Sequence, residues 1–159
     1  MTLRSTPLAI WLAVPLTAQV VGTWRVASQP NLSVLIDQAT AAMKPGERSH
    51  ARELLKKNTT AFKQVTITHG AGQITIQYGD EQRQCMPDDA LAVPWSRGDG
   101  QKYLVSGRFE GTTLIQTLLG EEGMRETAFH ERRDLLTMNV TVKAMMLPKP
   151  FRYTLTYRH

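Results

Sequence analysis

The side chains best suited to chemistry are four histidines and one cysteine, and their spacing fits neither a catalytic nor a metal-binding motif. The histidines are spread along the chain, at His50, His69, His130 and His159. Glu131 follows His130, but no second histidine follows at the distance that a zinc-protease helix requires. Because no pair of histidines has the separation that a zinc site favours, we predict no metal site.

Other catalytic signatures are also missing from the sequence. There is no Gly-x-Ser-x-Gly turn, phosphate-binding loop or dinucleotide fingerprint. Cys85 is the single cysteine, and a lone thiol most often behaves as a small buried apolar side chain. We therefore predict a protein that is not an enzyme and that uses no cofactor. In an isomerase or lyase, the groups that would have to converge inside the fold are His130, Glu126 and Arg108.

The composition is that of an ordinary folded protein with a mildly basic surface. The formal net charge is +5 at pH 7, with 42% hydrophobic and 21% charged residues. The lysines and arginines are scattered and are not interleaved with aromatic residues, so we expect no nucleic-acid partner.

An apolar segment, residues 8–18, follows Arg4 and ends in the small residues Thr17 and Ala18. A positive start, an apolar centre and a small-residue exit are typical of a secretory signal peptide. The segment is shorter than the roughly 20 residues needed to cross a bilayer, so we expect no stable membrane span. We predict a signal peptide over residues 1–18, one domain over residues 19–159, and a periplasmic or secreted location.

The first part of this domain combines one strand with two helices. A strand is expected over residues 20–28, and apolar residues then recur at three- and four-residue steps over residues 33–43. Pro45-Gly46 ends that first helix, and a second helix is expected over residues 47–59.

From Ala61 onward the apolar period changes from helical to two, which indicates strands. A hairpin turns at Gly70–Gly72, a short irregular strand lies near residues 82–86, and the loop 87–100 holds a brief strand around Val93. Further strands are expected over residues 103–110, 114–119, 124–132, 134–145 and 151–158. Short connections between such strands give an antiparallel up-and-down meander, which normally closes into a β-barrel. The fold class is therefore mainly β, with two short N-terminal helices.

A barrel of about eight strands is either filled by its own side chains or holds one small ligand. Gly107 lies in phase with the inward residues and is expected to leave space there. The candidate residues that line the interior alternate along their strands: Ile74, Ile76, Tyr78, Tyr103, Val105, Phe109, Leu136, Met138, Val140, Tyr153 and Leu155.

This layout resembles the calycin group, which contains the lipocalins and the fatty-acid-binding proteins. The matching features are Gly22-Thr23-Trp24 in the first strand, the meander, and an arginine late in the last strand. The resemblance implies that Trp24 closes one end of the barrel and that Arg152 or Arg158 packs over its ring. The two helices between the first and second strands are similar to the helical lid of fatty-acid-binding proteins.

One departure from that family concerns its carboxylate site. Fatty-acid-binding proteins hold a carboxylate with an Arg-x-Tyr on the last strand. This chain has Arg152-Tyr153 and Tyr157-Arg158, so no arginine and tyrosine two residues apart share a face. The sequence therefore does not predict a carboxylate site of that type.

The resulting prediction is a monomeric, lipocalin-like binding protein for a small apolar or amphipathic ligand. Apolar burial would drive binding, and polar groups at the barrel mouth, such as Arg108, Gln116 or Thr137, would orient the ligand. The main alternative is an envelope interaction module with a filled barrel, which would use its outer face or the loop 87–100.

Overall fold

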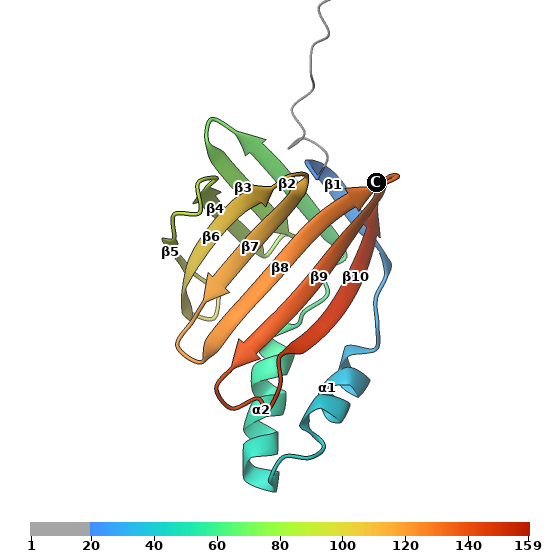
Figure 1. Cartoon of the computed structure of the whole chain (residues 1–159), viewed down its shortest axis with the longest axis vertical. Coiled ribbons are helices and arrows are strands. Elements are labelled where there is room, and N and C mark those ends of the chain that lie inside the picture. Colours follow the sequence, from blue (N-terminus) through green and yellow to red (C-terminus); the bar gives the residue numbers. More distant parts are fainter. Residues whose placement is uncertain (1–19) are drawn as a thin grey trace, which may run out of the picture.

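The structure, a computed structural model, describes residues 20–159, so the predicted signal peptide lies outside the described residues. The described chain forms a ten-stranded sheet and two helices (Figure 1). Within it, neither helix is long and apolar enough to cross a membrane. The elements are β1 (Gly22–Ser28), α1 (Leu32–Thr40), α2 (Pro45–Asn58), β2 (Gln64–Gly70), β3 (Gln73–Tyr78), β4 (Gln82–Pro87), β5 (Val93–Ser96), β6 (Lys102–Glu110), β7 (Thr113–Leu119), β8 (Gly123–Arg132), β9 (Leu135–Ala144) and β10 (Phe151–Arg158).

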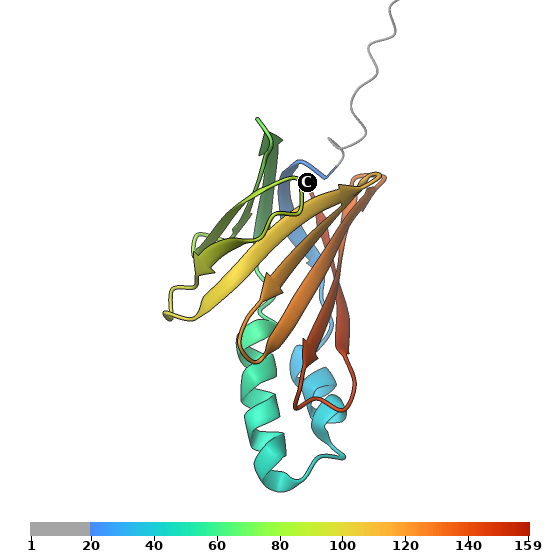
Figure 2. The same ribbon diagram turned by 60° about the vertical axis from the view of Figure 1, so that its left-hand side comes forward.

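The sheet is an antiparallel meander whose first and last strands meet. The strand order is β4-β3-β2-β1-β10-β9-β8-β7-β6-β5, so β1 pairs with both β2 and β10. Figures 1 and 2 show the sheet curling around a central axis. The predicted fold class, an up-and-down barrel with two N-terminal helices, is confirmed.

The two ends of the sheet, β4 and β5, do not pair with each other. The barrel is nearly closed because an isolated bridge and single hydrogen bonds hold this edge together. The chain leaving β4 forms an isolated bridge between Asp89 and Arg108, and the Ala90 amide donates to the Gly107 carbonyl at 3.0 Å. The Trp95 indole Nε1 of β5 donates to the Arg83 carbonyl of β4 at 2.8 Å.

The strands bury the residues that the two-residue period places inward. Of the predicted interior residues, Tyr103 and Phe109 are partly buried against the core, and the others belong to the buried core itself. The space predicted at Gly107 is not there. A Cβ at Gly107 would lie 2.9 Å from the Met86 Sδ and 3.1 Å from the Ile74 Cδ1, so these two side chains fill it.

The two helices extend from one end of the barrel, with the C-terminal end of α2 against it (Figures 1 and 2). The Asn31 side chain caps α1 by accepting from the Val34 amide at 3.2 Å, and Pro45 occupies the first turn of α2. On α2, Ala51, Leu54 and Leu55 are buried, which matches the predicted apolar face.

At the opposite end, His159 stacks on Trp24 with ring centroids 3.7 Å apart. The Trp24 Nε1 donates to the Val20 carbonyl at 3.0 Å, so the fully buried indole is also satisfied as a donor. The predicted arginine partner is wrong. Tyr153 and Tyr157 face inward on β10, so Arg152 and Arg158 face outward, where both are exposed, and His159, the residue after the strand, stacks on the indole.

Candidate functional site

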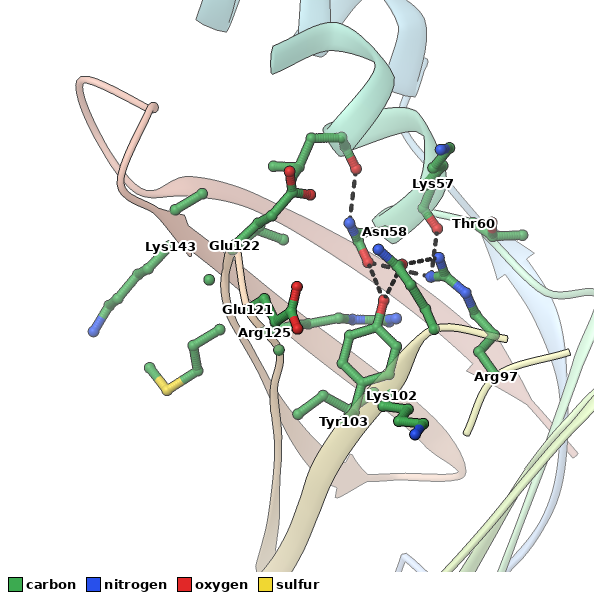
Figure 3. A pocket seen from close by; sticks show the side chains of 18 of the residues that line it. Lys57, Asn58, Thr60, Arg97, Lys102, Tyr103, Glu121, Glu122, Arg125 and Lys143 are labelled. Carbon is green, nitrogen blue, oxygen red and sulfur yellow. Dashed lines mark hydrogen bonds between the residues drawn. The ribbon is translucent and has the colours of Figure 1, made fainter. Parts of the chain in front are cut away.

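A cavity of about 660 Å³ lies between α2 and the end of the barrel (Figure 3). Its walls come from α2, the β5–β6 connection, the β7–β8 turn and the adjoining ends of β8 and β9. This volume falls within the range of small-molecule sites. Of the predicted interior residues only Tyr103 lines this cavity, because the others pack deeper in the barrel.

The cavity wall is amphipathic. Apolar side chains of the wall include Leu54, Phe62, Trp95, Leu118 and Val142. Charged side chains of both signs also line it: Glu53, Lys57, Arg97, Lys102, Glu121, Glu122, Arg125 and Lys143. Such a site suits a molecule with an apolar body and a polar group.

Arg97 ties the β5–β6 connection to the C-terminal end of α2 at the edge of this cavity (Figure 3). Its Nη1 donates to the Lys57 carbonyl at 3.2 Å and to the Asn58 Oδ1 at 3.3 Å. Its Nη2 donates to the Asp99 Oδ2 at 2.7 Å, and this hydrogen bond lowers the pKa of Asp99 to about 2. Because Arg97 carries several hydrogen bonds at once, it fixes the relative position of two cavity walls.

Arg125 is a half-buried charged residue on the inward face of β8, where it lines the cavity. Its Nε and Nη2 atoms are buried and have no hydrogen-bond partner within residues 20–159. The ion pairs of this described part of the chain all involve other residues. The guanidinium lies 6.0 Å from the centre of the Tyr78 ring. A guanidinium is cationic, so these two unpaired N–H donors are a candidate anion-binding feature.

The tyrosines around Arg125 cannot supply that negative charge. Burial raises the pKa of Tyr78 far above its usual value, and it also raises the pKa values of Tyr153 and Tyr157, the latter to about 12. All three hydroxyls are therefore neutral at physiological pH. The Tyr78 hydroxyl donates to the Gln116 Oε1 at 2.7 Å, and the Gln116 Nε2 in turn donates to the Gln84 Oε1. These hydrogen bonds satisfy the Tyr78 hydroxyl without a hydrogen bond to Arg125.

Comparison with solved structures identifies the architecture. A fatty-acid-binding protein of Schistosoma mansoni in complex with arachidonic acid is similar over 90% of this chain and 97% of its own, with a TM-score of 0.60 and 14% identity. The fatty-acid-binding protein of Manduca sexta matches 88% of this chain and 99% of its own, with a TM-score of 0.56 and 12% identity. The chain has the fatty-acid-binding-protein fold.

A secretory abundant heat soluble protein from Ramazzottius varieornatus has the same fold, with a TM-score of 0.61, 10% identity and coverage of 91% of this chain and 98% of its own. No protein-family model and no curated protein matches the sequence.

Within this fatty-acid-binding-protein fold, the polar residues predicted at the mouth are found elsewhere. Arg108 and Thr137 alternate with inward residues and so face outward, where Arg108 pairs with Glu110 at 2.8 Å. Gln116 does face inward, but it is fully buried in the hydrogen-bonded chain with Tyr78.

The groups considered for an isomerase or lyase do not converge. Arg125 and Thr127 face the interior of β8, so Glu126 and His130 face outward from the same strand. His130 is exposed and lies 3.3 Å from the Thr113 hydroxyl, and Arg108 is on the outer face of β6. Within residues 20–159, no group of three or more histidine, cysteine or carboxylate side chains is placed to hold a metal.

Cys85 is exposed, which contradicts its expected burial. It lies between the inward residues Gln84 and Met86 of β4 and therefore faces outward, with its Sγ 3.3 Å from the Thr75 Oγ1. Burial of the thiol was expected from its residue type alone, whereas inward and outward residues alternate along β4 and place Cys85 outside.

Arg125 was not among the residues predicted to line the interior, although its position in the sequence carries a signal. Arg125 precedes Thr127 and Phe129 at two-residue steps, in phase with an inward face. A charged residue in that phase marks either a strand end or a buried charge. Arg125 is half-buried near the start of β8, and its Nε and Nη2 atoms are buried.

Proposed function

We propose that this protein binds a small amphipathic carboxylate, such as a medium-chain fatty acid, without altering it chemically. The carboxylate pairs with Arg125, and the apolar chain lies against the cavity wall. The observation that carries this proposal is the buried, unpaired Nε and Nη2 edge of Arg125. Solved structures of fatty-acid-binding proteins with the same fold support it.

The geometry of the free edge favours a planar anion. Nε and Nη2 present two parallel N–H groups, which match the two oxygens of a carboxylate in a bidentate pair. Because Arg125 is surrounded by neutral tyrosines, one bound monoanion balances the local charge. An alcohol or ester of the same chain length lacks that charge and should bind more weakly.

The chain of the ligand has an apolar path toward α2. Leu118 and Val142 flank Arg125 in the sheet register, and both line the cavity. Leu54 of α2 and Phe62 line it farther out. Because Met86 and Ile74 fill the floor of the barrel near Gly107, the ligand occupies the end nearest α2.

We propose further that the protein is exported. The support is the signal-peptide pattern of residues 1–18, and the test is the N-terminal sequence and mass of the protein recovered from its host. A mature chain that starts near Gln19 agrees with export, whereas a retained Met1 contradicts it.

The binding proposal is tested by isothermal titration calorimetry with decanoate, using decan-1-ol as the uncharged comparison. We expect Arg125→Gln to weaken decanoate binding by about 10- to 100-fold, the typical worth of a charge-assisted hydrogen bond. Arg132→Gln, at an exposed position of the same strand, is the matched control and should bind like the wild type. Equal decanoate affinity in all three proteins would contradict the assignment of Arg125.

A further inference from the structure

We propose that the preferred ligand carries an aromatic ring a short distance from its carboxylate, and that Phe62, Trp95 and Tyr103 recognise this ring. The inference rests on the proposed function of Arg125 as the carboxylate partner. It narrows the ligand from amphipathic carboxylates in general to arylalkanoic acids.

The aromatic rings that the core leaves partly uncovered gather at the cavity. Among the described phenylalanine, tyrosine and tryptophan residues, six are buried in the core and four are only partly buried. Of these four, Phe62, Trp95 and Tyr103 line the cavity. The fourth, Phe109, lies outside the cavity lining and packs on His69, with ring centroids 4.9 Å apart. Ring surface available to a ligand is therefore concentrated at one site.

The three rings come from separate segments that the fold brings together. Phe62 lies in the connection between α2 and β2, whereas Trp95 is on β5 and Tyr103 is on β6. Trp95 and Tyr103 are directly paired in the sheet, and their ring centroids lie 5.8 Å apart. The Phe62 ring lies 5.3 Å from that of Tyr78, which in turn lies 6.0 Å from the Arg125 guanidinium. Aromatic side chains thus continue from Phe62 to the proposed carboxylate partner.

Hydrogen bonds hold two of the rings in place. The Trp95 Nε1 donates to the Arg83 carbonyl at 2.8 Å, and the Tyr103 hydroxyl donates to the Gln101 Oε1 at 2.7 Å. Side chains that are already ordered lose little conformational freedom on binding, and a rigid ligand ring loses little as well. A flexible alkyl chain would have to be ordered against the same wall.

The sheet register sets the distance between this wall and Arg125. Arg125 of β8 pairs with Leu118 of β7, which pairs with Val105 of β6, and Tyr103 lies two residues before Val105. With strands about 4.8 Å apart and about 3.3 Å per residue along a strand, the Tyr103 and Arg125 backbones lie roughly 12 Å apart. Because both side chains line the cavity, one ring on a short linker spans the interval that remains (Figure 3).

Aliphatic side chains also line the cavity, at the position of the linker. Leu118 and Val142 flank Arg125 on the neighbouring strands, where they can cover methylene groups next to the carboxylate. Contact between two aromatic rings adds an attraction beyond the burial of apolar area. The site should therefore prefer an aromatic ring to a saturated ring of the same size.

The test compares 4-phenylbutanoate with 4-cyclohexylbutanoate by isothermal titration calorimetry. The two acids share one carbon skeleton and differ only in whether the ring is aromatic. We expect the wild-type chain to bind the phenyl acid about three- to tenfold more tightly, the typical effect of an aromatic pair. Burial of apolar area alone would favour the saturated ring, which is the more apolar one.

Variants identify the rings that carry this preference. Trp95→Leu and Tyr103→Leu replace a ring by an apolar side chain, so each should lower the affinity ratio of the two acids toward one. Tyr103→Phe keeps the ring, and Phe109→Leu changes the partly buried ring outside the cavity, so both should keep the wild-type ratio. A ratio that stays at the wild-type value in both leucine variants would contradict the inference.

A measurement on the wild-type protein does not depend on the folding of the leucine variants. The indole N–H proton of Trp95, identified in the NMR spectrum by its absence from Trp95→Phe, should shift in the ring current of bound 4-phenylbutanoate. The cyclohexyl acid has no ring current and should shift it much less. Equal shifts would place the ligand ring away from Trp95 and overturn the inference.

The calorimetric outcomes also distinguish this inference from the proposed function. If the wild-type chain binds both ring acids equally, or the saturated acid more tightly, the aromatic preference is wrong while the carboxylate site stands. Absence of binding for both acids and for decanoate would overturn the proposed function itself.

Discussion

The imidazole of His159 lies against the indole of Trp24, with 3.7 Å between ring centroids, and thereby joins the end of the last strand to the first. Gly22 makes this contact possible. A Cβ at Gly22 would lie 2.8 Å from the His159 Cε1, and the residue has a φ of +151°. The Gly-x-Trp triplet is therefore explained by the ring that occupies the space above the glycine.

We predict that His159→Ala lowers the free energy of unfolding by about 1 kcal/mol, the usual worth of an aromatic pair. Gly22→Ala should cost about 2 kcal/mol, because it combines backbone strain with the loss of the same contact. Urea denaturation followed by tryptophan fluorescence measures both. His130→Ala, at an exposed histidine, is the control and should be nearly neutral. A neutral Gly22→Ala would show that the stacked arrangement is not formed in solution.

A second prediction concerns the filled floor of the barrel. Gly107→Ala places a methyl group 2.9 Å from the Met86 Sδ and 3.1 Å from the Ile74 Cδ1, so we expect a loss of about 1–3 kcal/mol from overpacking. Gly98→Ala is the matched control, since nothing lies within 4 Å of its Cβ position. Chemical denaturation compares the two variants. A stable Gly107→Ala would mean that this part of the barrel is open.

Alkaline pH tests the burial of the tyrosines. Burial raises the pKa of Tyr157 from 10.0 to about 12 and raises the pKa of Tyr78 further. The folded state therefore favours the neutral phenol. This contribution to stability is complete below pH 10, declines as the unfolded chain ionises, and is lost as the pH rises through 12.

We expect the native protein to show little tyrosinate absorbance at 295 nm at pH 11, whereas the urea-unfolded chain should ionise near pH 10. Tyr157→Phe should remove one group that ionises only at high pH, without altering the rest of the titration curve. If the folded and unfolded chains titrate together, the tyrosines are accessible to water and the description of the interior is wrong.

The Arg97 contacts give a fourth prediction. Arg97→Met removes the hydrogen bonds to the Lys57 carbonyl and the Asn58 side chain. The C-terminal turn of α2 and the β5–β6 connection should then exchange their amide hydrogens faster, with the core strands unchanged. Hydrogen exchange monitored by mass spectrometry measures this, and Arg83→Met, at an exposed position of β4, is the control.

These contacts should also persist in mild acid. The Asp99 carboxylate has its pKa lowered from 3.8 to about 2 by the Arg97 hydrogen bond. Its contribution is present above pH 4 and is lost as the pH falls through 2. Fast exchange in wild-type α2 at pH 5 would contradict this role of Arg97.

The meander was predictable from sequence because several strands alternate apolar and polar residues, as in the strand from Phe151 to Arg158. The helices were predictable because Pro45-Gly46 separates two segments with helical spacing. Local pattern is sufficient for such elements, since most strands pair with their neighbours in the chain; the pairing of β1 with β10 is the exception.

Contacts between distant strands were not predictable in this way. Met86 fills the space at Gly107 although β4 and β6 are not paired, and His159 reaches Trp24 only because it lies beyond the end of β10. The inward phase of Arg125 can be read from β8, but the lack of a counter-ion becomes apparent only when the whole interior is assembled.

The most direct test of the account is the pKa of a carboxylate bound beside Arg125. Decanoate labelled with ¹³C at its carboxyl carbon is titrated by NMR in complex with the wild-type protein and with Arg125→Gln. A nearby guanidinium favours the ionised form, so we predict that the bound carboxyl keeps its ionised chemical shift well below its ordinary titration range. A wild-type complex whose carboxyl titrates in the ordinary range, or in the same range as in Arg125→Gln, would contradict the claim that Arg125 holds the anion.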